Sequence, residues 1–269
     1  MLWIDTHCHL DAHEFGGADE SLGVARQAQA AGVAMIVLPA VARDNFDTVA
    51  ALAAAAPNAS YALGIHPIYV PHAVEEDLVL LRARVEAALA DPRFVAIGEI
   101  GLDFFIPALC TPAMREKQDY FFAQQLRIAR DMGLPVLMHV RRSQDQILKH
   151  VRRIAPAGGI AHAFNGSFQQ AQMFIDLGFK LGFGGAMTFT RALQIRRLAS
   201  ELPLAAIVLE TDAPDIAPAW LHPGRNSPEQ LPAIGAVLAQ LRGLALDAVA
   251  AQTSSNALAA LPRLASLFA

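Results

Sequence analysis

Cysteine and long apolar runs are both scarce in this sequence. Only two of its 269 residues are cysteine, which excludes the disulfide framework of a small secreted protein. The first residues, Met1–Asp5, carry neither the basic residues nor the long apolar run of a signal peptide. No uninterrupted apolar stretch reaches the length of a membrane span. We therefore expect a cytoplasmic protein that does not associate with a membrane.

Basic charge is also in short supply. Lys and Arg together number 21 against 25 Asp and Glu, only three of them are Lys, and the formal net charge is -4. This balance argues against a broad basic surface that grips duplex nucleic acid, although it leaves room for a small local patch. A length of 269 residues suits one barrel-sized unit, so we expect a single domain over residues 1–269.

Short apolar segments alternate with longer amphipathic ones along the chain. The apolar segments have the length and content of buried parallel strands. They are Leu2–Asp5, Val33–Pro39, Tyr61–Ile65, Phe94–Glu99, Pro135–His139, Gly159–Ala163, Lys180–Gly184 and Ala206–Glu210. The amphipathic segments predict helices, with Ser143 and Ser167 as N-caps of two of them. These segments are Glu20–Ala31, Asp44–Ala56, Glu75–Ala90, Arg115–Met132, Ser143–Ile154, Ser167–Leu177, Ala192–Leu202 and Pro228–Leu241, followed by Asp247–Leu261 as an extra helix.

Eight strand–helix pairs predict an α/β fold, with a TIM (β/α)8 barrel as the leading architecture. A doubly wound open sheet is the structural alternative. We disfavour it because no glycine-rich dinucleotide-binding turn follows the first apolar segment. The barrel has a direct consequence for function, because the active site of such a barrel lies at the C-terminal ends of its strands.

Polar side chains gather at those strand ends. His7 and His9 follow the first strand. Because alternate residues of an extended segment face the same way, both can point into the barrel mouth while Cys8 points away. One further histidine or acidic residue lies at the end of each of four other strands. These residues are Glu99, His139, His162 and Asp212.

Four imidazoles and two carboxylates on one rim predict a metal site, because zinc and other first-row ions prefer these ligands. Six ligands are too many for one catalytic zinc, but they suit two ions about 3.5–4 Å apart that share a carboxylate and a water. Glu99 is the best candidate for the shared carboxylate. A lone histidine is more often a loop or core residue, and we interpret His222, in a Pro-rich loop, as a surface residue.

Five segments that contain these residues resemble the signatures of the TatD-type metal-dependent hydrolases, a family of the amidohydrolase superfamily, and within it the YjjV-like branch. The segments occur in order over nearly the whole chain. They are Ile4–Leu10 (IDTHCHL), Gly64–Pro67 (GIHP), Gly98–Asp103 (GEIGLD), His162–Ser167 (HAFNGS) and Leu209–Pro214 (LETDAP).

The resemblance implies a TIM barrel of the metal-dependent hydrolase type that holds two divalent ions, which could be zinc, manganese or magnesium. It divides the predicted ligands into two sets with Glu99 between them. The sets are His7, His9 and Asp212 for one ion, and His139 and His162 for the other. It also implies hydrolysis of ester bonds by a deoxyribonuclease, 3′–5′ exonuclease-like on single-stranded DNA. We expect no obligate protein partner.

Two departures from the family pattern concern the loops rather than the ligands. Ala163 and Asn165 stand where the family commonly has Cys and Ser. The loop after the last strand reads HPGRNSPE over residues 222–229, where the family usually has a basic stretch. Because loops on the barrel rim contact substrate, these changes bear on substrate identity and not on metal binding.

The expected mechanism uses a metal-activated hydroxide that attacks phosphorus or a carbonyl carbon, with Glu99 as the bridging ligand. Asp212 is the candidate proton acceptor, because it can contact both metal and nucleophile. His66, at the end of the third strand, is expected to bind a phosphate oxygen or to protonate the leaving group. The alternative for His66 is that it orients a carboxylate. Arg141 and Arg225 are candidates for binding a phosphate, the alternative for Arg141 being a pair with a surface acid.

Some residues near the predicted site have two interpretations. Asp103 and Glu210 are candidates for orienting the ligands, and Glu210 could equally be a buried charge satisfied by a neighbour. Phe104, Phe105 and Trp220 could stack on bases or pack against the protein.

Two other functions stay open at this point. A small-molecule ester, lactone or amide hydrolase could use the same metal site, because one barrel hosts many chemistries. A metal-binding protein without catalysis is disfavoured, because both the ligand set and Asp212 are intact.

Overall fold

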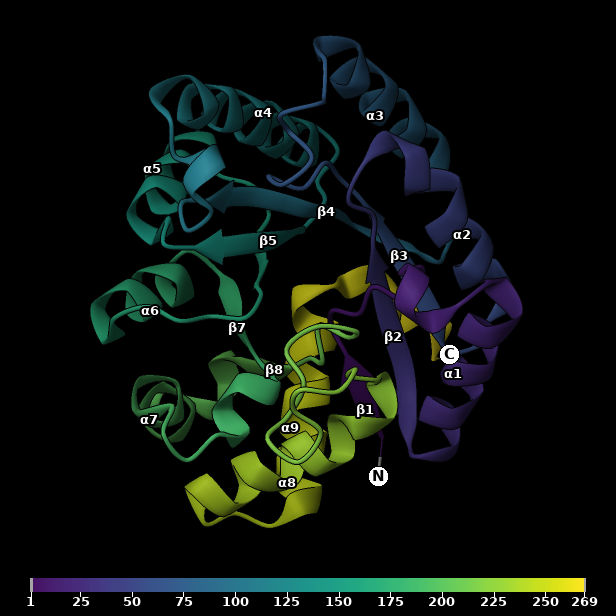
Figure 1. The fold of residues 1–269 in the computed structure, drawn as a ribbon, viewed down its shortest axis with the longest axis vertical. Coiled ribbons are helices and arrows are strands. Elements are labelled where there is room, and N and C mark those ends of the chain that lie inside the picture. The colour runs from purple at the N-terminus through teal and green to yellow at the C-terminus, as the bar shows by residue number, and fades with distance from the viewer. Residues whose placement is uncertain (1, 269) are drawn as a thin grey trace.

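The computed structural model describes residues 2–268, and its central feature is a single eight-stranded sheet. The strands follow one another in chain order, each neighbouring pair is parallel, and helices surround the sheet (Figure 1). The strands are β1 (Trp3–Asp5), β2 (Val33–Pro39), β3 (Ala59–Leu63), β4 (Phe94–Asp103), β5 (Val136–Arg141), β6 (Gly159–Ala161), β7 (Phe179–Phe183) and β8 (Ile207–Leu209).

The helices lie outside the sheet because their apolar faces pack on the outer faces of the strands. Each predicted helix is present, with ends shifted by a few residues. The α-helices are α1 (Ala18–Ala30), α2 (Phe46–Ala55), α3 (Glu75–Ala88), α4 (Pro112–Asp131), α5 (Gln144–Ile154), α6 (Phe168–Asp176), α7 (Leu193–Glu201), α8 (Leu231–Arg242) and α9 (Leu246–Ala260).

Hydrogen bonds between the first and the last strand segments bring the two edges of the sheet together. The Thr6 N–H donates to Leu209 O at 3.1 Å, and the Asp212 N–H donates to His7 O at 2.8 Å. The parallel sheet therefore forms a nearly closed barrel, which confirms the predicted TIM architecture. This junction also places the residues after β1 directly beside those after β8.

The C-terminal segment covers the end of the barrel at which the strands begin. A buried apolar cluster takes one side chain or more from seven of the strands, among them Ile4, Val95 and Leu137. Leu261 and Leu264, at and after the end of α9, belong to the same cluster. In Figure 1, α9 accordingly lies behind the barrel centre. The predicted extra helix thus covers this end of the barrel. The opposite end, where the C-terminal ends of the strands lie, remains available for a site.

Three helix starts show where the sequence prediction was right and wrong. Ser167 is an N-cap as predicted, because its hydroxyl accepts from the Gln170 N–H at 3.1 Å. Ser143 precedes α5, but its hydroxyl donates to Leu102 O at 2.7 Å, so its predicted capping role is wrong. Thr111 caps α4, which therefore begins earlier than predicted.

Among residues 2–268, no single helix is both long and apolar enough to cross a membrane. The segments Pro228–Arg242 and Leu246–Ala260, bent by 110° relative to each other, meet the length and composition criteria only as a pair. Each of these helices buries one apolar face in the fold.

Candidate metal centre

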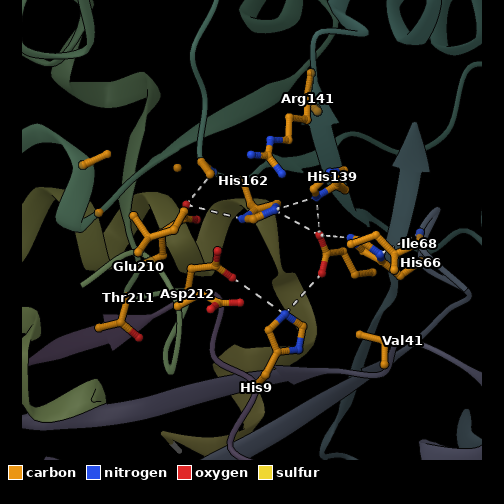
Figure 2. Close-up of a pocket in the computed structure, with 18 of the residues that line it drawn as sticks. His9, Val41, His66, Ile68, His139, Arg141, His162, Glu210, Thr211 and Asp212 are labelled. Atoms are coloured by element: carbon orange, nitrogen blue, oxygen red, sulfur yellow. Dashed lines mark hydrogen bonds and ion pairs between the residues drawn. The ribbon is translucent and has the colours of Figure 1, made fainter. Parts of the chain in front are cut away.

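The C-terminal ends of the strands open into one cavity of about 1360 Å³. The lining includes five of the six predicted metal ligands, together with His66 and Arg141 (Figure 2). The five ligands are His9, Glu99, His139, His162 and Asp212. The sixth, His7, is fully buried against them. The fold thus brings together all the residues that the sequence predicted as ligands.

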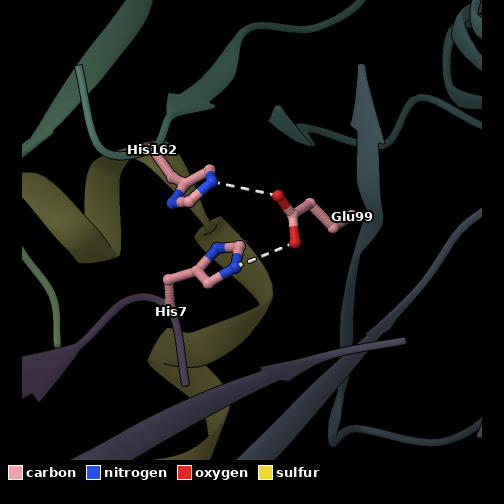
Figure 3. A group of neighbouring side chains, drawn as sticks. All are labelled: His7, Glu99 and His162. Carbon is pink, nitrogen blue, oxygen red and sulfur yellow. Dashed lines mark hydrogen bonds and ion pairs between the residues drawn. The ribbon is translucent and has the colours of Figure 1, made fainter. Parts of the chain in front are cut away.

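Glu99 lies at the centre of this cluster, and its two carboxylate oxygens face different groups of histidines. Oε2 lies 3.1 Å from His7 Nε2 and 3.4 Å from His9 Nε2. Oε1 lies 3.1 Å from His139 Nδ1 and 3.0 Å from His162 Nε2. Figure 3 shows the carboxylate spanning His7 and His162. Each carboxylate oxygen therefore faces its own pair of these ring nitrogens, and His7, Glu99 and His162 also form one group whose ligand atoms lie within 4.8 Å of one another.

The strand geometry explains why Glu99 reaches this position. It was predicted at the end of its strand, but β4 continues to Asp103. The β4–β5 register shifts between Ile97 and Ile100, around Glu99, and the Glu99 N–H donates to Ala40 O instead. Because this irregularity lies within the strand, the side chain is held by backbone on both sides and is 1% exposed.

His7, His9 and Asp212 form a group whose ligand atoms all lie within 4.8 Å of one another. Asp212 Oδ1 is 3.6 Å from His7 Nε2 and 3.7 Å from His9 Nε2. These separations are too long for direct hydrogen bonds, but they suit nitrogen and oxygen ligands around one ion at about 2.0–2.2 Å from each. The group could therefore hold a divalent cation.

The backbone around Asp212 is held in an uncommon conformation. Asp212 has φ 56°, and Ala163, directly after His162, has φ 44°. Residues other than glycine rarely adopt such angles, and they persist where the surrounding structure requires them, often at functional sites. Asp212 is itself a candidate metal ligand, and Ala163 directly follows the candidate ligand His162. At each position the turn aims the side chain of the candidate ligand into the cavity.

Asp103 fixes the orientation of the His139 ring. His139 Nε2 lies 3.1 Å from Asp103 Oδ2, and its Nδ1 lies 3.1 Å from Glu99 Oε1. A neutral imidazole carries one N–H, so once Asp103 accepts it the Nδ1 lone pair faces the Glu99 carboxylate. Two such acceptors repel each other, and a cation between them would remove the conflict. The donor set therefore fits a metal ion, with Asp103 in the orienting role expected from the sequence.

His66 also lies against Glu99, with its Nε2 3.3 Å from Glu99 Oε1. His66, Glu99 and His139 form a further group whose ligand atoms all lie within 4.8 Å of one another. The Ile68 N–H donates to His66 Nδ1 at 3.1 Å, so Nδ1 must offer a lone pair. The ring proton of the neutral imidazole then sits on Nε2, which faces Glu99 Oε1 at the edge of the cavity (Figure 2). This tautomer suits a hydrogen-bond donor better than a metal ligand, and it also suits the alternative expectation that His66 orients a carboxylate.

The pKa values of the acidic side chains at the site follow from their burial and from the titratable groups packed against them. Although burial alone would raise it, the pKa of Glu99 is held well below its ordinary range by His66, His7 and His162. Burial, opposed in part by His162, raises the pKa of Asp212 to about 6. For Asp103, burial is outweighed by the hydrogen bond from His139 and by backbone N–H groups, which lower its pKa to about 2.

Glu210 lies behind His162. Its Oε1 accepts a short hydrogen bond from the Ala163 N–H and lies 3.7 Å from His162 Nδ1. Gly182 makes room for this carboxylate, because a Cβ at that position would come within 2.1 Å of Glu210 Oε2. Glu210 is therefore well placed to orient His162, which was one of its two predicted roles.

Asp5 is an acidic residue beside the candidate ligands that the sequence analysis did not single out. It is fully buried, and its carboxylate accepts hydrogen bonds from the His7 N–H, the Thr211 N–H and the Thr211 hydroxyl. Burial raises its pKa to about 7 despite these bonds. The network ties β1 to the segment after β8. Alternation placed Asp5 on the same side as His7 and His9, and this signal could have found it.

The two arginines expected to bind phosphate lie in different places. Arg141 lines the metal cavity, its guanidinium stacks at 3.9 Å on the ring of Phe105, and it lies 3.9 Å from Asp103. The Arg142 guanidinium also lies over this ring, 4.6 Å from its centre. Arg225 instead lines a neighbouring hollow and donates to Glu14 O at 2.7 Å.

A parallel barrel with histidine and acidic side chains converging at the C-terminal ends of its strands defines a metal-dependent hydrolase. The family model described as TatD related DNase matches residues 4–262. The chain belongs to the TatD family, as its sequence motifs predicted.

Individual relatives agree with this assignment. The chain is 40% identical over 255 residues to the metal-dependent hydrolase YjjV of Escherichia coli strain K12, with 94% of this chain and 95% of that protein covered. The crystal structure of YjjV, a TatD homologue, matches with a TM-score of 0.89 at 37% identity, covering 97% of this chain and 98% of that one. A TatD family hydrolase from Entamoeba histolytica shares the fold, with a TM-score of 0.83 at 17% identity and coverage of 97% and 98%.

Proposed function

We propose that this protein hydrolyses phosphodiester bonds at the 3′ end of single-stranded DNA, with two divalent ions held on either side of Glu99. The observation that carries the proposal is the division of the two Glu99 oxygens between separate groups of histidines. Two-metal hydrolases use a shared ligand of this kind to hold ions about 3.5–4 Å apart. The description of the family as a DNase supports the choice of substrate.

We assign the ligands to the two ions as the sequence motifs suggested. His7, His9 and Asp212 would hold one ion, and His139 and His162 would hold the other. Imidazole nitrogen suits zinc better than magnesium, whereas carboxylate oxygen also suits manganese. We therefore expect zinc or manganese to support activity better than magnesium.

When bound, the two ions would lower the pKa of water and offset the negative charge of the phosphate. Asp212 would accept the proton of the attacking water, because its carboxylate reaches both His7 and His9 and is open to the cavity. The His66 Nε2–H would donate to a phosphate oxygen or to the leaving group. Arg141 would bind a second phosphate oxygen from the cavity wall.

A test starts from protein stripped of metal by chelation and reloaded with zinc, manganese or magnesium. A single-stranded oligonucleotide labelled at its 5′ end should shorten progressively from its 3′ end. Metal analysis should give two ions per chain, and Glu99→Ala should abolish both the second ion and the cleavage while leaving the circular dichroism spectrum unchanged. Shortening that does not depend on added metal, or that persists in Glu99→Ala, would refute the proposal.

A small-molecule hydrolase is the second candidate, and one observation favours it. Five carboxylates outside the ligand set line the cavity, and they would repel a phosphate backbone. They are Asp11, Glu14, Asp44, Glu210 and Asp215. Turnover of a simple ester, lactone or amide by the metal-loaded protein, without any cleavage of DNA, would establish this alternative.

A further inference from the structure

A second hollow, of about 900 Å³, opens beside the metal cavity, between the segment after β7 and the loop after β8. We call it the side hollow and define it by Phe189, Arg191, His222 and Arg225, which line it and do not line the metal cavity. The two spaces share a rim that includes Pro214. They therefore lie next to each other.

We propose that the side hollow binds a nucleobase of the substrate strand, next to the phosphodiester that is cleaved. This inference rests on the proposed nuclease function and adds a subsite to it. Asp215, on the shared rim, is three residues from Asp212, and three extended residues span at most about 10–11 Å. A nucleotide unit that follows a phosphate held at Asp212 can therefore reach the hollow.

The walls of the side hollow offer an aromatic surface. The rings of Phe189 and His222 lie 5.5 Å apart at an angle of 82°, so residues from opposite walls meet edge to face. The Arg191 guanidinium lies 5.8 Å from the centre of the Phe189 ring. Bases stack on aromatic rings and on arginine with little dependence on sequence, which suits a strand-trimming enzyme.

Charge is distributed so that a base and a phosphate would take different parts of the hollow. Glu14 and Asp215 lie on the rim shared with the metal cavity, whereas Arg191 and Arg225 border the side hollow alone. Carboxylates repel phosphate but accept hydrogen bonds from the amino groups of bases. The base would therefore face the shared rim, and the following phosphate would lie at the outer edge beside the arginines.

The two arginines have different roles in this arrangement. Arg225 donates to Glu14 O and stacks at 4.6 Å on Phe15, so it links the loops after β8 and β1 and positions the wall. Arg191 is exposed, and within residues 2–268 it forms no ion pair. Its guanidinium is therefore free to bind the outer phosphate.

The test compares two substrates on the metal-loaded protein. A single-stranded oligonucleotide needs both the metal centre and the side hollow, whereas bis(4-nitrophenyl) phosphate needs the metal centre alone. Phe189→Ala should lower kcat/KM on the oligonucleotide by about five- to a hundredfold, the value of one stacked base, and should leave the small diester within about twofold. Arg191→Gln should also weaken oligonucleotide binding. The dependence of the binding constant on salt concentration should become less steep, by the amount expected for about one phosphate contact.

The control variants lie outside both cavities. Tyr120→Ala removes an exposed aromatic residue of α4, and Arg197→Gln removes an exposed arginine of α7 that pairs with Glu201. Neither substitution should change the kcat/KM on either substrate. An oligonucleotide with an abasic site next to the scissile bond should lose as much as Phe189→Ala does, and the two changes together should lose no more than one alone.

The outcomes separate the subsite from the function on which it rests. Equal losses on both substrates, losses of the same size in Tyr120→Ala, or additive losses with the abasic oligonucleotide would each overturn the subsite. Oligonucleotide cleavage that is unchanged in Phe189→Ala and Arg191→Gln would also overturn it while leaving the nuclease function intact. If the wild-type protein cleaves the small diester but no oligonucleotide, the proposed nuclease function fails and the subsite fails with it.

Discussion

Replacing Asp103 by Asn tests whether the His139 ring is oriented for metal binding. Asp103 is fully buried, and its Oδ2 accepts the His139 Nε2–H at 3.1 Å. The substitution keeps the side-chain shape but removes the charge, and an amide N–H facing His139 would favour the other tautomer. That tautomer places a hydrogen on Nδ1, where the lone pair for the ion should be.

The size of the effect follows from this one contact. A hydrogen bond to a charged group contributes about 1.5–3 kcal/mol, which corresponds to about a ten- to hundredfold loss of affinity for the ion beside Glu99 Oε1. A competition titration against a chromophoric chelator measures this loss directly, and the kcat of the metal-saturated protein measures it independently. The affinity for the other ion, beside His7 and His9, should change little.

Asp119 supplies the matched control, because it accepts from His150 Nε2 at 3.0 Å in the same carboxylate–histidine geometry, between α4 and α5. Asp119→Asn should bind both ions as the wild type does. Wild-type affinity for both ions in Asp103→Asn would refute the reasoning, and so would equal losses in the two variants.

Four other predictions follow from the same contacts. Asp212→Asn should keep at least one ion but lose about a hundredfold or more in kcat, and normal turnover with bound metal would show that Asp212 is not the base. Thr211→Val removes the hydroxyl that donates to Asp5 and should lower the free energy of unfolding in urea by about 1.5–3 kcal/mol, whereas Thr211→Ser should cost less. Gly182→Ala would place a Cβ 2.1 Å from Glu210 Oε2 and should destabilise the protein by about 1–3 kcal/mol, an effect that a neutral result in thermal unfolding would contradict. Metal loading at a hundred times its dissociation constant should stabilise the fold by about 2.7 kcal/mol per ion, and metal affinity should fall as pH is lowered, because protons compete for the histidine nitrogens.

The barrel was predictable because its strands are short apolar segments of uniform kind, separated by amphipathic helices. The prediction placed β2 at its observed bounds, Val33–Pro39. It placed the third strand at Tyr61–Ile65, whereas β3 runs from Ala59 to Leu63. The reason is tertiary: the Gln125 side chain pairs with both the N–H and the carbonyl of Ile65, so Ile65 leaves the ladder. Sequence periodicity carries no information about such a partner.

The sequence placed the residues proposed to contact substrate less well than the candidate metal ligands. Arg141 lies in the cavity wall, but Arg225 lies in the side hollow and is engaged with Glu14. His222, interpreted from the sequence as a surface residue, is exposed and also lines that hollow. Loop conformation decides these positions, and the loops follow no periodic pattern.

The candidate metal centre stands out in the sequence because it conflicts with the stability of the isolated chain. Burying Glu99 among several histidines leaves lone pairs facing one another, as at a neutral His139 Nδ1, and burying ionisable groups costs free energy unless they are paired. A cation on each side of the carboxylate would remove both problems. Natural sequences violate local stability rules mainly at functional sites, so polar residues at the ends of buried strands mark such a site. Arg191 and Phe189 cause no conflict of this kind, and only the structure could bring them to notice.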